Sequence, residues 1–239
     1  MAAVRQEDRG LVTGSTRFVA DIPFDGLHAA FARSTEPHGT IVAVDTADAA
    51  AVAGVVAVET SDTLALDAFE HLAALDARHA RHPLADGTVR HVGEAVAVVV
   101  AASEPAAVDA VELVAIDIDP LPPVVDPGRN DPLLYPASGT NETASIDREG
   151  PDALDAADVI VELELINPRI ASAPVENDGI IATPTPDGGL DIVCTSQGVH
   201  AVRDDLARAL ELDAERLLSL IHISEPTRHI CLSRMPSSA

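Results

Sequence analysis

Large aromatic side chains are nearly missing from this sequence. It contains no tryptophan, one tyrosine and four phenylalanines in 239 residues. A core must therefore be built from valine, leucine, isoleucine and alanine, which favours sheets and small-residue helices. Lysine is absent, so all 15 basic residues are arginines, and 39 acidic residues bring the formal net charge to −24. A field of that sign repels phosphate backbones and anionic membrane surfaces, so we expect neither a nucleic-acid nor a membrane partner.

Cysteines and long apolar runs are also scarce. The two cysteines, Cys194 and Cys231, make no disulfide framework. The opening MAAVRQEDRG has no apolar core typical of a signal peptide. The longest apolar run, 95–102, is too short to cross a bilayer. We therefore expect a cytoplasmic protein in a reducing compartment.

Strand and helix patterns alternate through the first half of the chain. GEAVAVVVAAS (93–103) is almost continuously apolar, which predicts a strand buried on both faces. Ser103 is placed to cap a helix over 104–114, and a strand over 114–119 follows, so that a βαβ-type crossover is expected. The other elements expected here are strands over 28–34, 40–46 and 55–59, helices over 47–54 (capped by Thr46, ended by Gly54) and 61–70, and a loop over 71–88.

The pattern changes after about residue 150. Residues 126–150 are rich in Pro, Gly, Asn and Asp and are typical of a connection between domains. VIVELELIN (159–167) alternates apolar and acidic residues, which predicts a half-exposed antiparallel strand. A hairpin over 179–196 with the turn PDGG, and an amphipathic helix over 198–212, should follow. The apolar face of that helix is expected from Val199, Val202, Leu206, Ala209 and Leu210.

Few residues carry recognisable chemistry. His79 and His82 are a loosely spaced pair, and we interpret them as solvated histidines rather than metal ligands. The pairs Asp117/Asp119 and Glu162/Glu164 fit the solvated face of a strand better than an acid/base couple. In TSQG (195–198), Gln197 lies where a strand ends and a helix begins, a place where polar groups meet ligands. From spacing alone, a polar helix-start residue remains the more favoured interpretation of Gln197.

Six stretches, in order, resemble one family. They are RQEDRGLVTGSTRFVADI (5–22), LHAAFARS, TVRHVGEAVAVVVA, VAIDIDPLPPVVDP, NPRIASAPVENDG and CTSQGVHAVRDDLARALELDAERL. The family is the molybdenum-binding large subunit of the xanthine dehydrogenase, aldehyde oxidase and aerobic carbon monoxide dehydrogenase group. The resemblance implies an α+β fold: an a/b hammerhead domain followed by the truncated start of a molybdenum-cofactor-binding domain, which GTN (139–141) would open.

The resemblance also implies a chemistry. The family hydroxylates an electron-poor carbon of an aldehyde or N-heterocycle, or oxidises CO, with water as the oxygen source. Its molybdenum is bound to a pterin dinucleotide, and electrons leave through Fe–S and FAD. Gln197 matches the glutamine that hydrogen-bonds an oxo ligand of molybdenum, and Glu176 matches a glutamate placed in a supporting role. No residue here matches a metal ligand or the catalytic base glutamate, which is expected beyond residue 217. The family's usual order is Ser-Thr-Gln, whereas Thr195 precedes Ser196 here, and this weakens assignment to a subtype.

These observations lead to a division of the chain and to two functional hypotheses. We expect a hammerhead domain over 1–128, a linker over 129–157 and an incomplete cofactor-binding domain over 158–217. LSLIHISEPTR (218–228) and SRMPSSA (233–239) correspond to translated sequencing adapters, so we expect 218–239 not to be native. The first hypothesis is a piece of a hydroxylase large subunit, inactive by itself. In the complete protein it would bind a small-molecule substrate, an Fe–S small subunit and an FAD-binding medium subunit in a hetero-oligomer. The alternative is a non-catalytic acidic hammerhead module that docks an Fe–S or flavin partner.

Overall fold

The computed structural model describes residues 8–68, 77–126, 128–144, 157–165, 173, 176–196 and 198–222. The chain forms two compact units, one from Asp25–Ile146 and one from Met1–Phe24 together with Asp147–Ala239. The residues before Asp25 therefore group with those after Ile146. The division expected from the sequence, with its boundaries near 128 and 158, stays a prediction.

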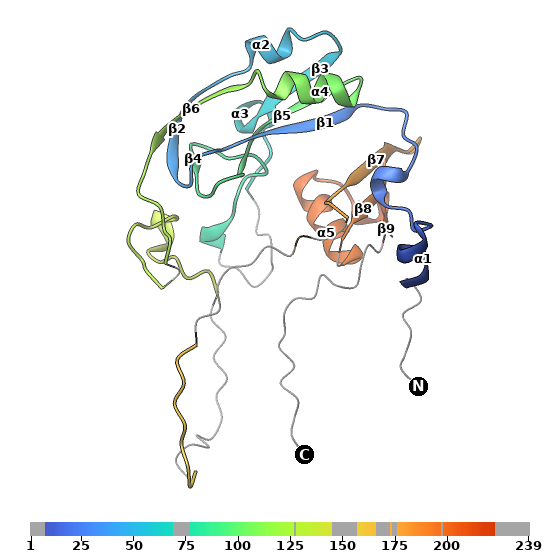
Figure 1. The fold of residues 1–239 in the computed structure, drawn as a ribbon. Helices are drawn as coiled ribbons and strands as arrows, with labels where there is room; N and C mark the ends of the chain where they lie inside the picture. Colours follow the sequence, from blue (N-terminus) through green and yellow to red (C-terminus); the bar gives the residue numbers. More distant parts are fainter. Residues whose placement is uncertain are drawn as a thin grey trace. The chain divides into compact units, whose positions relative to one another are not determined.

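One three-stranded sheet of the Asp25–Ile146 unit has β5 (Ala95–Ala101) at its centre. β1 (His28–Arg33) and β3 (Val55–Thr60) flank it, and both pair with it antiparallel (Figure 1). Four side chains of β5 are at most 1% exposed: Val96, Ala97, Val99 and Ala101. Ala97, Val99 and Ala101 lie on one face, whereas on the other face Val96 is buried and Val98 and Val100 are partly exposed. The prediction of a strand buried on both faces is therefore confirmed for one face and only in part for the other.

A second sheet of this unit joins β4 (Thr88–Val89), β2 (Gly39–Asp45) and β6 (Ala115–Pro120), again antiparallel. The expected βαβ crossover from β5 to β6 is therefore wrong, because the two strands belong to different sheets. β6 alternates, with Ile116 and Ile118 packed on the core and Asp117 and Asp119 exposed as expected. Such a one-sided strand suits an antiparallel partner better than a place beside β5.

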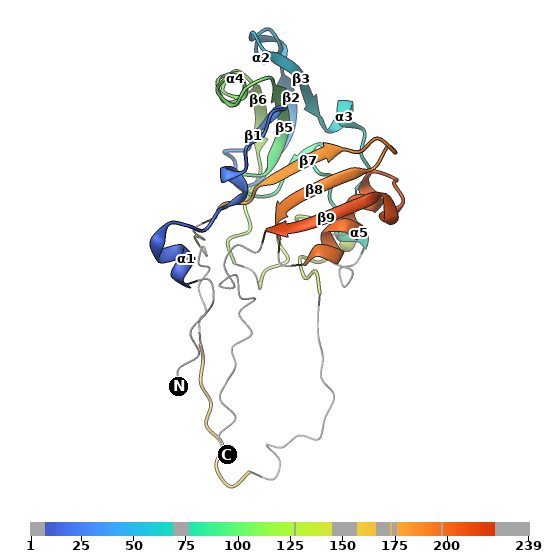
Figure 2. The ribbon, with the colours of Figure 1, turned by 90° about the vertical axis from the view of Figure 1, so that its right-hand side faces the viewer.

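Helix α4 (Glu104–Val111) covers the β1–β5–β3 sheet and buries Ala107 and Ala110 (Figure 2). Ser103 caps it as predicted, since its Oγ accepts a hydrogen bond from the backbone N–H of Ala106 (3.4 Å). The cap expected at Thr46 is wrong, because its side chain makes no capping bond to α2 (Ala47–Ala50). Asp45 Oδ1 accepts instead from the backbone N–H of Ala47 (2.9 Å).

The remaining segments of this unit are more ordered than their composition indicates. α3 (Ser61–Leu64) is shorter than expected and ends at Ala65, which has a positive φ of 50°. Of the expected loop over 71–88, the described part contains the 3₁₀ turn η2 (Ala77–His79) and the start of β4. A second 3₁₀ turn, η3 (Pro136–Ser138), lies in the expected linker. There Asn141 accepts from the backbone N–H of Leu134 and donates to the carbonyl of Pro132, at 2.8 Å each.

The other unit contains the sheet β7–β8–β9 with α5 (Val199–Ala209) packed on it (Figure 2). β7 (Ile180–Pro184) and β8 (Leu190–Thr195) form the predicted hairpin, and β9 (Leu217–His222) pairs with β8 in parallel. The parallel strand–helix–strand connection thus runs from β8 through α5 to β9. Its last strand includes 218–222, the first residues of the stretch expected to be foreign; the origin of that stretch stays a prediction.

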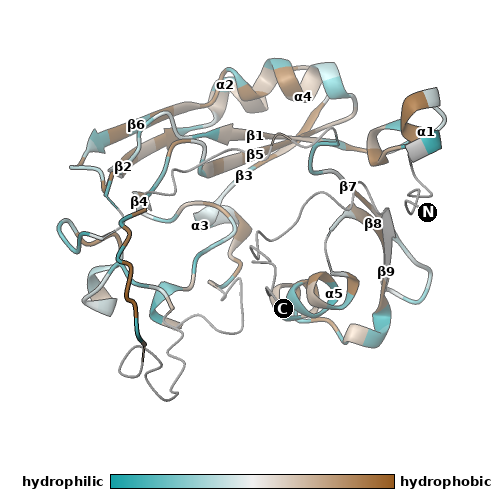
Figure 3. Cartoon of the chain, turned by 60° about the horizontal axis from the view of Figure 1, so that its bottom comes forward, coloured by the Kyte–Doolittle hydropathy of each residue, from teal (hydrophilic) through white to brown (hydrophobic). Residues whose placement is uncertain are grey.

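Two sequence patterns in this unit mislead. The described part of the expected strand 159–167, residues 159–165, contains no strand, and its side chains are exposed, with Val161 at 83%. An alternating pattern of apolar and acidic residues forms a strand only where a neighbouring strand pairs with it. Within the described residues, no strand pairs with this segment. In α5, Val202 and Leu206 face the core as predicted, but Leu210 is 39% exposed and Ala207 is buried instead. Both colours of Figure 3 are present along α5, as an amphipathic helix requires.

In the described part of the chain no helix has the length and hydropathy needed to cross a membrane. The remaining elements, α1 (Asp8–Thr13), η1 (Val19–Asp21) and η5 (Ala214–Arg216), are short and belong to the same compact unit as β7, β8 and β9.

Candidate functional site

The connection between β8 and α5 contains the residue singled out by sequence, Gln197. β8 ends at Thr195 and α5 begins at Val199, so the prediction of a strand-to-helix junction is confirmed. Gln197 itself lies outside the described residues, and its role stays a prediction. On either side of it, Ser196 Oγ accepts a hydrogen bond from the backbone N–H of Gly198 (3.0 Å). That bond satisfies a backbone donor at the helix start without using a glutamine side chain.

Thr195 closes the strand end just before this junction. Its Oγ1 accepts from the backbone N–H of Gly179 (2.7 Å) and donates to the carbonyl of Gly179 (3.1 Å). The Thr195 backbone N–H also donates to that carbonyl (3.0 Å). Three bonds between one threonine and one glycine pin the end of β8 to the start of β7, so the residues that follow Thr195 leave the sheet from a rigid point.

Glu176 is the second residue singled out, and it is 5% exposed. Its Oε1 accepts a hydrogen bond from the backbone N–H of Val19 (2.8 Å), 157 positions earlier in the chain. Val19 is itself buried and approaches Gly179, where an added Cβ would lie 3.2 Å from the Val19 side chain. Glu176 therefore holds the early segment Val19–Asp21 near Gly179 and the end of β8. That strand end is Thr195, two residues before Gln197. No sequence signal indicated this pairing, because its two partners lie far apart in the chain.

An apolar cluster packs β8, α5 and β9 together beneath the β8–α5 junction, between the sheet and the helix. Ile192, Cys194, Ala207 and Leu217 are buried together, with Leu190, Val202 and Leu206 packed against them. At the far end of the hairpin, Arg216 Nη2 donates to the carbonyl of Asp187 (2.7 Å). The pKa of the exposed Asp187 carboxyl is lowered, first by a hydrogen bond from the Thr185 hydroxyl and then by backbone N–H donors. These contacts stabilise the hairpin and its sheet at the end away from Gln197.

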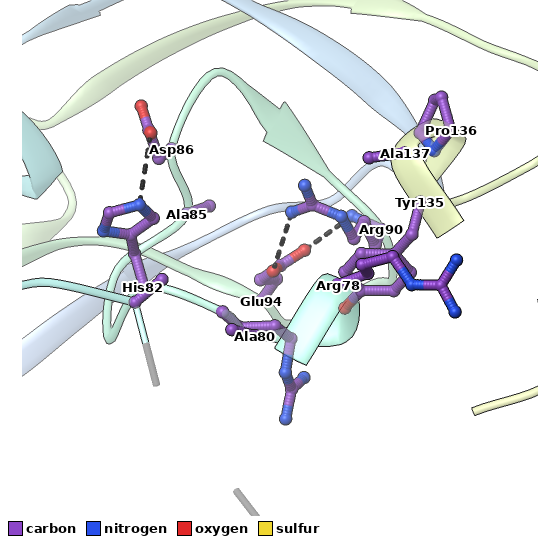
Figure 4. A pocket seen from close by; sticks show the side chains of 12 residues that line it. Arg78, Ala80, His82, Ala85, Asp86, Arg90, Glu94, Tyr135, Pro136 and Ala137 are labelled. Atoms are coloured by element: carbon purple, nitrogen blue, oxygen red, sulfur yellow. Dashed lines mark hydrogen bonds and ion pairs between the residues drawn. The ribbon is translucent and has the colours of Figure 1, made fainter. Parts of the chain in front are cut away.

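A cavity of about 280 Å³ lies in the other unit, within Asp25–Ile146. Its lining is rich in charge, with Arg78, Arg81, His82, Asp86, Arg90 and Glu94, and includes the ring of Tyr135 (Figure 4). The sequence did not indicate this site, since Arg78 and Arg81 come from a stretch expected to be a loop and Tyr135 from an expected linker. Three arginines within 13 residues were the available signal.

The histidines of that stretch are not alike. His79 is 4% exposed, so the interpretation as a solvated histidine is wrong for it. Its ring lies edge-on to Tyr135 with 5.1 Å between centroids, and its Nε2 is 3.4 Å from the carbonyl of Thr140. His82 is partly exposed, with Nδ1 3.0 Å from the carbonyl of Leu66 and Nε2 3.5 Å from Asp86. Among the described residues, no three His, Cys, Asp or Glu side chains are grouped as a metal site would require.

Comparison with known proteins assigns both parts of the chain. Residues 13–122 match the aldehyde oxidase and xanthine dehydrogenase a/b hammerhead domain, and residues 136–220 match the molybdopterin cofactor-binding domain. The chain belongs to the molybdenum-binding large-subunit family of xanthine dehydrogenases and carbon monoxide dehydrogenases. Its fold is accordingly the α+β hammerhead followed by the start of the cofactor-binding domain, as the sequence predicted.

Curated members of the family are about 30% identical. The gamma subunit of the 6-hydroxypseudooxynicotine dehydrogenase complex of Paenarthrobacter nicotinovorans is 31% identical over 226 residues, covering 87% of this chain and 28% of the relative. The carbon monoxide dehydrogenase large chain of Afipia carboxidovorans is 31% identical, covering 83% and 27%. The chain thus spans under a third of the length of these relatives.

Solved structures of the family agree with the fold. Reconstituted CO dehydrogenase from Oligotropha carboxidovorans has a TM-score of 0.75 at 29% identity, covering 94% of this chain and 31% of that one. Quinoline 2-oxidoreductase from Pseudomonas putida 86 has a TM-score of 0.73 at 26% identity, covering 94% and 30%.

The family implies a bound molybdopterin group, and the polar side chains near the end of β8 show whether this part of the chain could ligate a metal directly. The described polar groups there, Thr195, Ser196 and Glu176, are bound to backbone atoms of the protein itself. Because these side chains are bound to the backbone, they fit a supporting role beside a cofactor better than a set of metal ligands. This agrees with a family whose molybdenum is bound by a pterin.

Proposed function

We propose that this chain forms the hammerhead domain and the first cofactor-contacting segment of the catalytic large subunit of a molybdenum hydroxylase. The complete subunit would hydroxylate an electron-poor carbon of an aldehyde or N-heterocycle, or oxidise CO, with water as the oxygen source. The observation that carries the proposal is the order of the two matched domains together with the β8–α5 junction at Gln197.

Gln197 would donate its side-chain N–H to an oxygen of the bound molybdenum centre. A neutral amide suits this role, because it stabilises an oxygen without giving it a proton. Glu176 would act as a positioning residue, holding Val19 beside the strand from which Gln197 follows. The molybdenum–pterin dinucleotide, when bound, supplies the activated oxygen and accepts the electrons.

The proposal includes partners. Electrons would pass to an Fe–S small subunit and an FAD-binding medium subunit in a cytoplasmic hetero-oligomer. Support comes from relatives that are named as subunits, such as the gamma subunit of a complex and a large chain.

The test uses the complete large subunit that carries these residues, expressed with its Fe–S and FAD subunits in a host that makes the cofactor. We expect about one molybdenum per subunit and turnover of one substrate class among CO, aldehydes and N-heterocycles. Gln197→Ala should lower kcat by about 10²-fold, as loss of one preorganised donor does, while leaving the molybdenum content and the assembly unchanged. Ser196→Ala, one residue away, is the matched control.

Two results would refute parts of the proposal. An assembled, fully loaded complex that oxidises none of the three classes would support the alternative, a docking module without catalysis. Full activity of the Gln197→Ala complex would remove the role proposed for that side chain. For the 239-residue chain by itself we propose no stoichiometric molybdenum binding and no turnover, which metal analysis of the purified chain checks directly.

A further inference from the structure

The cavity of the Asp25–Ile146 unit has a charge opposite to that of the protein as a whole. The chain carries 39 acidic residues against 15 arginines, yet among the described residues three arginines line this one cavity, against two acidic residues, Asp86 and Glu94. His82 adds a fourth group that can carry positive charge. Cationic side chains gathered at one concave site in an acidic protein create a local field that attracts anions.

The two acidic residues that line the cavity already have partners, an arginine for Glu94 and a histidine for Asp86. Glu94 lies against Arg90, with Oε1 3.9 Å from Arg90 Nη1 and Oε2 accepting from the backbone N–H of Arg90 (2.5 Å), as Figure 4 shows. Asp86 lies 3.5 Å from His82. Arg90 is held further by the carbonyls of Thr88 (3.0 Å) and Leu134 (3.3 Å). Glu94 and Asp86 therefore lie beside Arg90 and His82, and neither of these carboxylates is within ion-pair distance of Arg81.

Arg81 is another arginine of this cavity. It is partly buried and lines the cavity, and no described residue gives it a hydrogen bond or an ion pair. Arg78, which also lines the cavity, donates to the carbonyl of Ser138 (3.3 Å). A partly buried guanidinium binds best to an oxyanion, whose two oxygens match its two parallel N–H donors.

Tyr135 adds a neutral donor to the same cavity. Its ring lies under the Arg90 guanidinium, 4.8 Å from the ring centroid, and against the edge of His79. Burial raises the pKa of the Tyr135 hydroxyl, an effect that the charges of Arg90 and Arg81 only partly oppose. The hydroxyl stays protonated at neutral pH and can donate to an anion.

We propose that this cavity binds a small oxyanion, a phosphate or a short carboxylate, through the guanidinium of Arg81 with Arg78 and the Tyr135 hydroxyl as further donors. The volume of about 280 Å³ is at the lower limit of small-molecule pockets, which start at about 300 Å³, and so excludes a dinucleotide. The site lies in the Asp25–Ile146 unit and involves neither Gln197 nor Glu176, so it does not depend on the proposed hydroxylase function.

The protein contains its own probe for the test. Tyr135 is the single tyrosine and tryptophan is absent, so tyrosine fluorescence reports on this cavity alone. The purified 239-residue chain is titrated with inorganic phosphate in one arm and succinate in the other, with ionic strength held constant by sodium chloride. We expect a saturable change in Tyr135 emission in at least one arm, and the arm that saturates identifies phosphate or carboxylate as the ligand.

The variants separate a site from general charge screening. Arg81→Gln should weaken binding about tenfold or more, the effect of losing a charged hydrogen bond. Arg81→Lys keeps the positive charge but loses the paired N–H donors of the guanidinium, so it should weaken binding less. It replaces Arg81→Gln in the test if that variant does not fold. Arg203→Gln is the control, because Arg203 lies on α5 in the other unit, paired with Asp204. Absence of saturation in both arms, or equal affinity of the Arg81 variants and the unaltered chain, overturns the proposal.

Discussion

Replacing Glu176 by alanine tests a long-range hydrogen bond within the unit that contains β7, β8 and β9. The change removes the carboxylate that accepts from the backbone N–H of Val19, 157 positions away. Both residues are buried, Glu176 at 5% and Val19 at 4% exposure, so bulk water does not reach the Val19 N–H while the segment stays docked. The expected response is local release of Val19–Asp21 from the β7–β8 strand end.

The magnitude follows from the cost of an unsatisfied buried donor, about 1–3 kcal/mol. If the segment escapes that cost by opening, its opening equilibrium shifts by about 5- to 150-fold. The Val19 amide should then exchange its hydrogen faster by that factor. Glu176→Gln keeps an oxygen acceptor of the same reach and should change the exchange rate much less.

Hydrogen exchange of the intact chain, read by NMR at individual amides, measures the effect. The amide of Val99 in β5 belongs to the other unit and is the internal control, which neither variant should alter. If the Val19 amide of Glu176→Ala exchanges as slowly as in the unaltered chain, Glu176 does not hold this segment. The positioning role proposed for it would then be lost.

Three further predictions concern the core, a helix cap and the cavity. Ile192→Ala should lower the free energy of unfolding of its unit by about 2–5 kcal/mol, because Ile192 is 1% exposed. Ile180→Ala on the neighbouring strand, 59% exposed, should cost under about 1 kcal/mol; equal losses in urea unfolding would contradict the packing described. Ser103→Ala should destabilise its unit by about 1 kcal/mol, whereas Thr46→Ala, whose side chain makes no capping bond, should have little effect in the same assay. Absorbance titration should show a pKa of Tyr135 above its ordinary 10.0 in the folded protein. Because the folded-state pKa is the higher one, this group's stabilisation is complete below about pH 10 and is lost as the pH rises through the folded-state value. A folded-state pKa at or below that of the urea-unfolded chain would show that burial does not govern the hydroxyl.

Local features were predictable because the residues that cause them are neighbours in the chain. The continuous apolar run of β5 requires cover on both faces wherever the strand is placed. Ser103 caps α4 through an amide only three residues away. The β7–β8 hairpin needs a turn between two apolar strands, and Gly188 supplies the positive φ of 80°. The site residue Gln197 could be located at a strand-to-helix junction for the same reason, although its contacts could not be derived.

The tertiary structure decided which segments become partners. β6 was predicted as a strand, but its placement beside β2 rather than β5 depends on which sheet can bury Ile116 and Ile118 while leaving Asp117 in water. The alternating segment 159–165 has the pattern of a strand but, within the described chain, no sheet to join. The Val19–Glu176 bond and the cavity around Tyr135 likewise join residues from distant stretches. Such pairings follow from competition among buried surfaces over the whole chain, whereas sequence patterns report only on a residue's own neighbours.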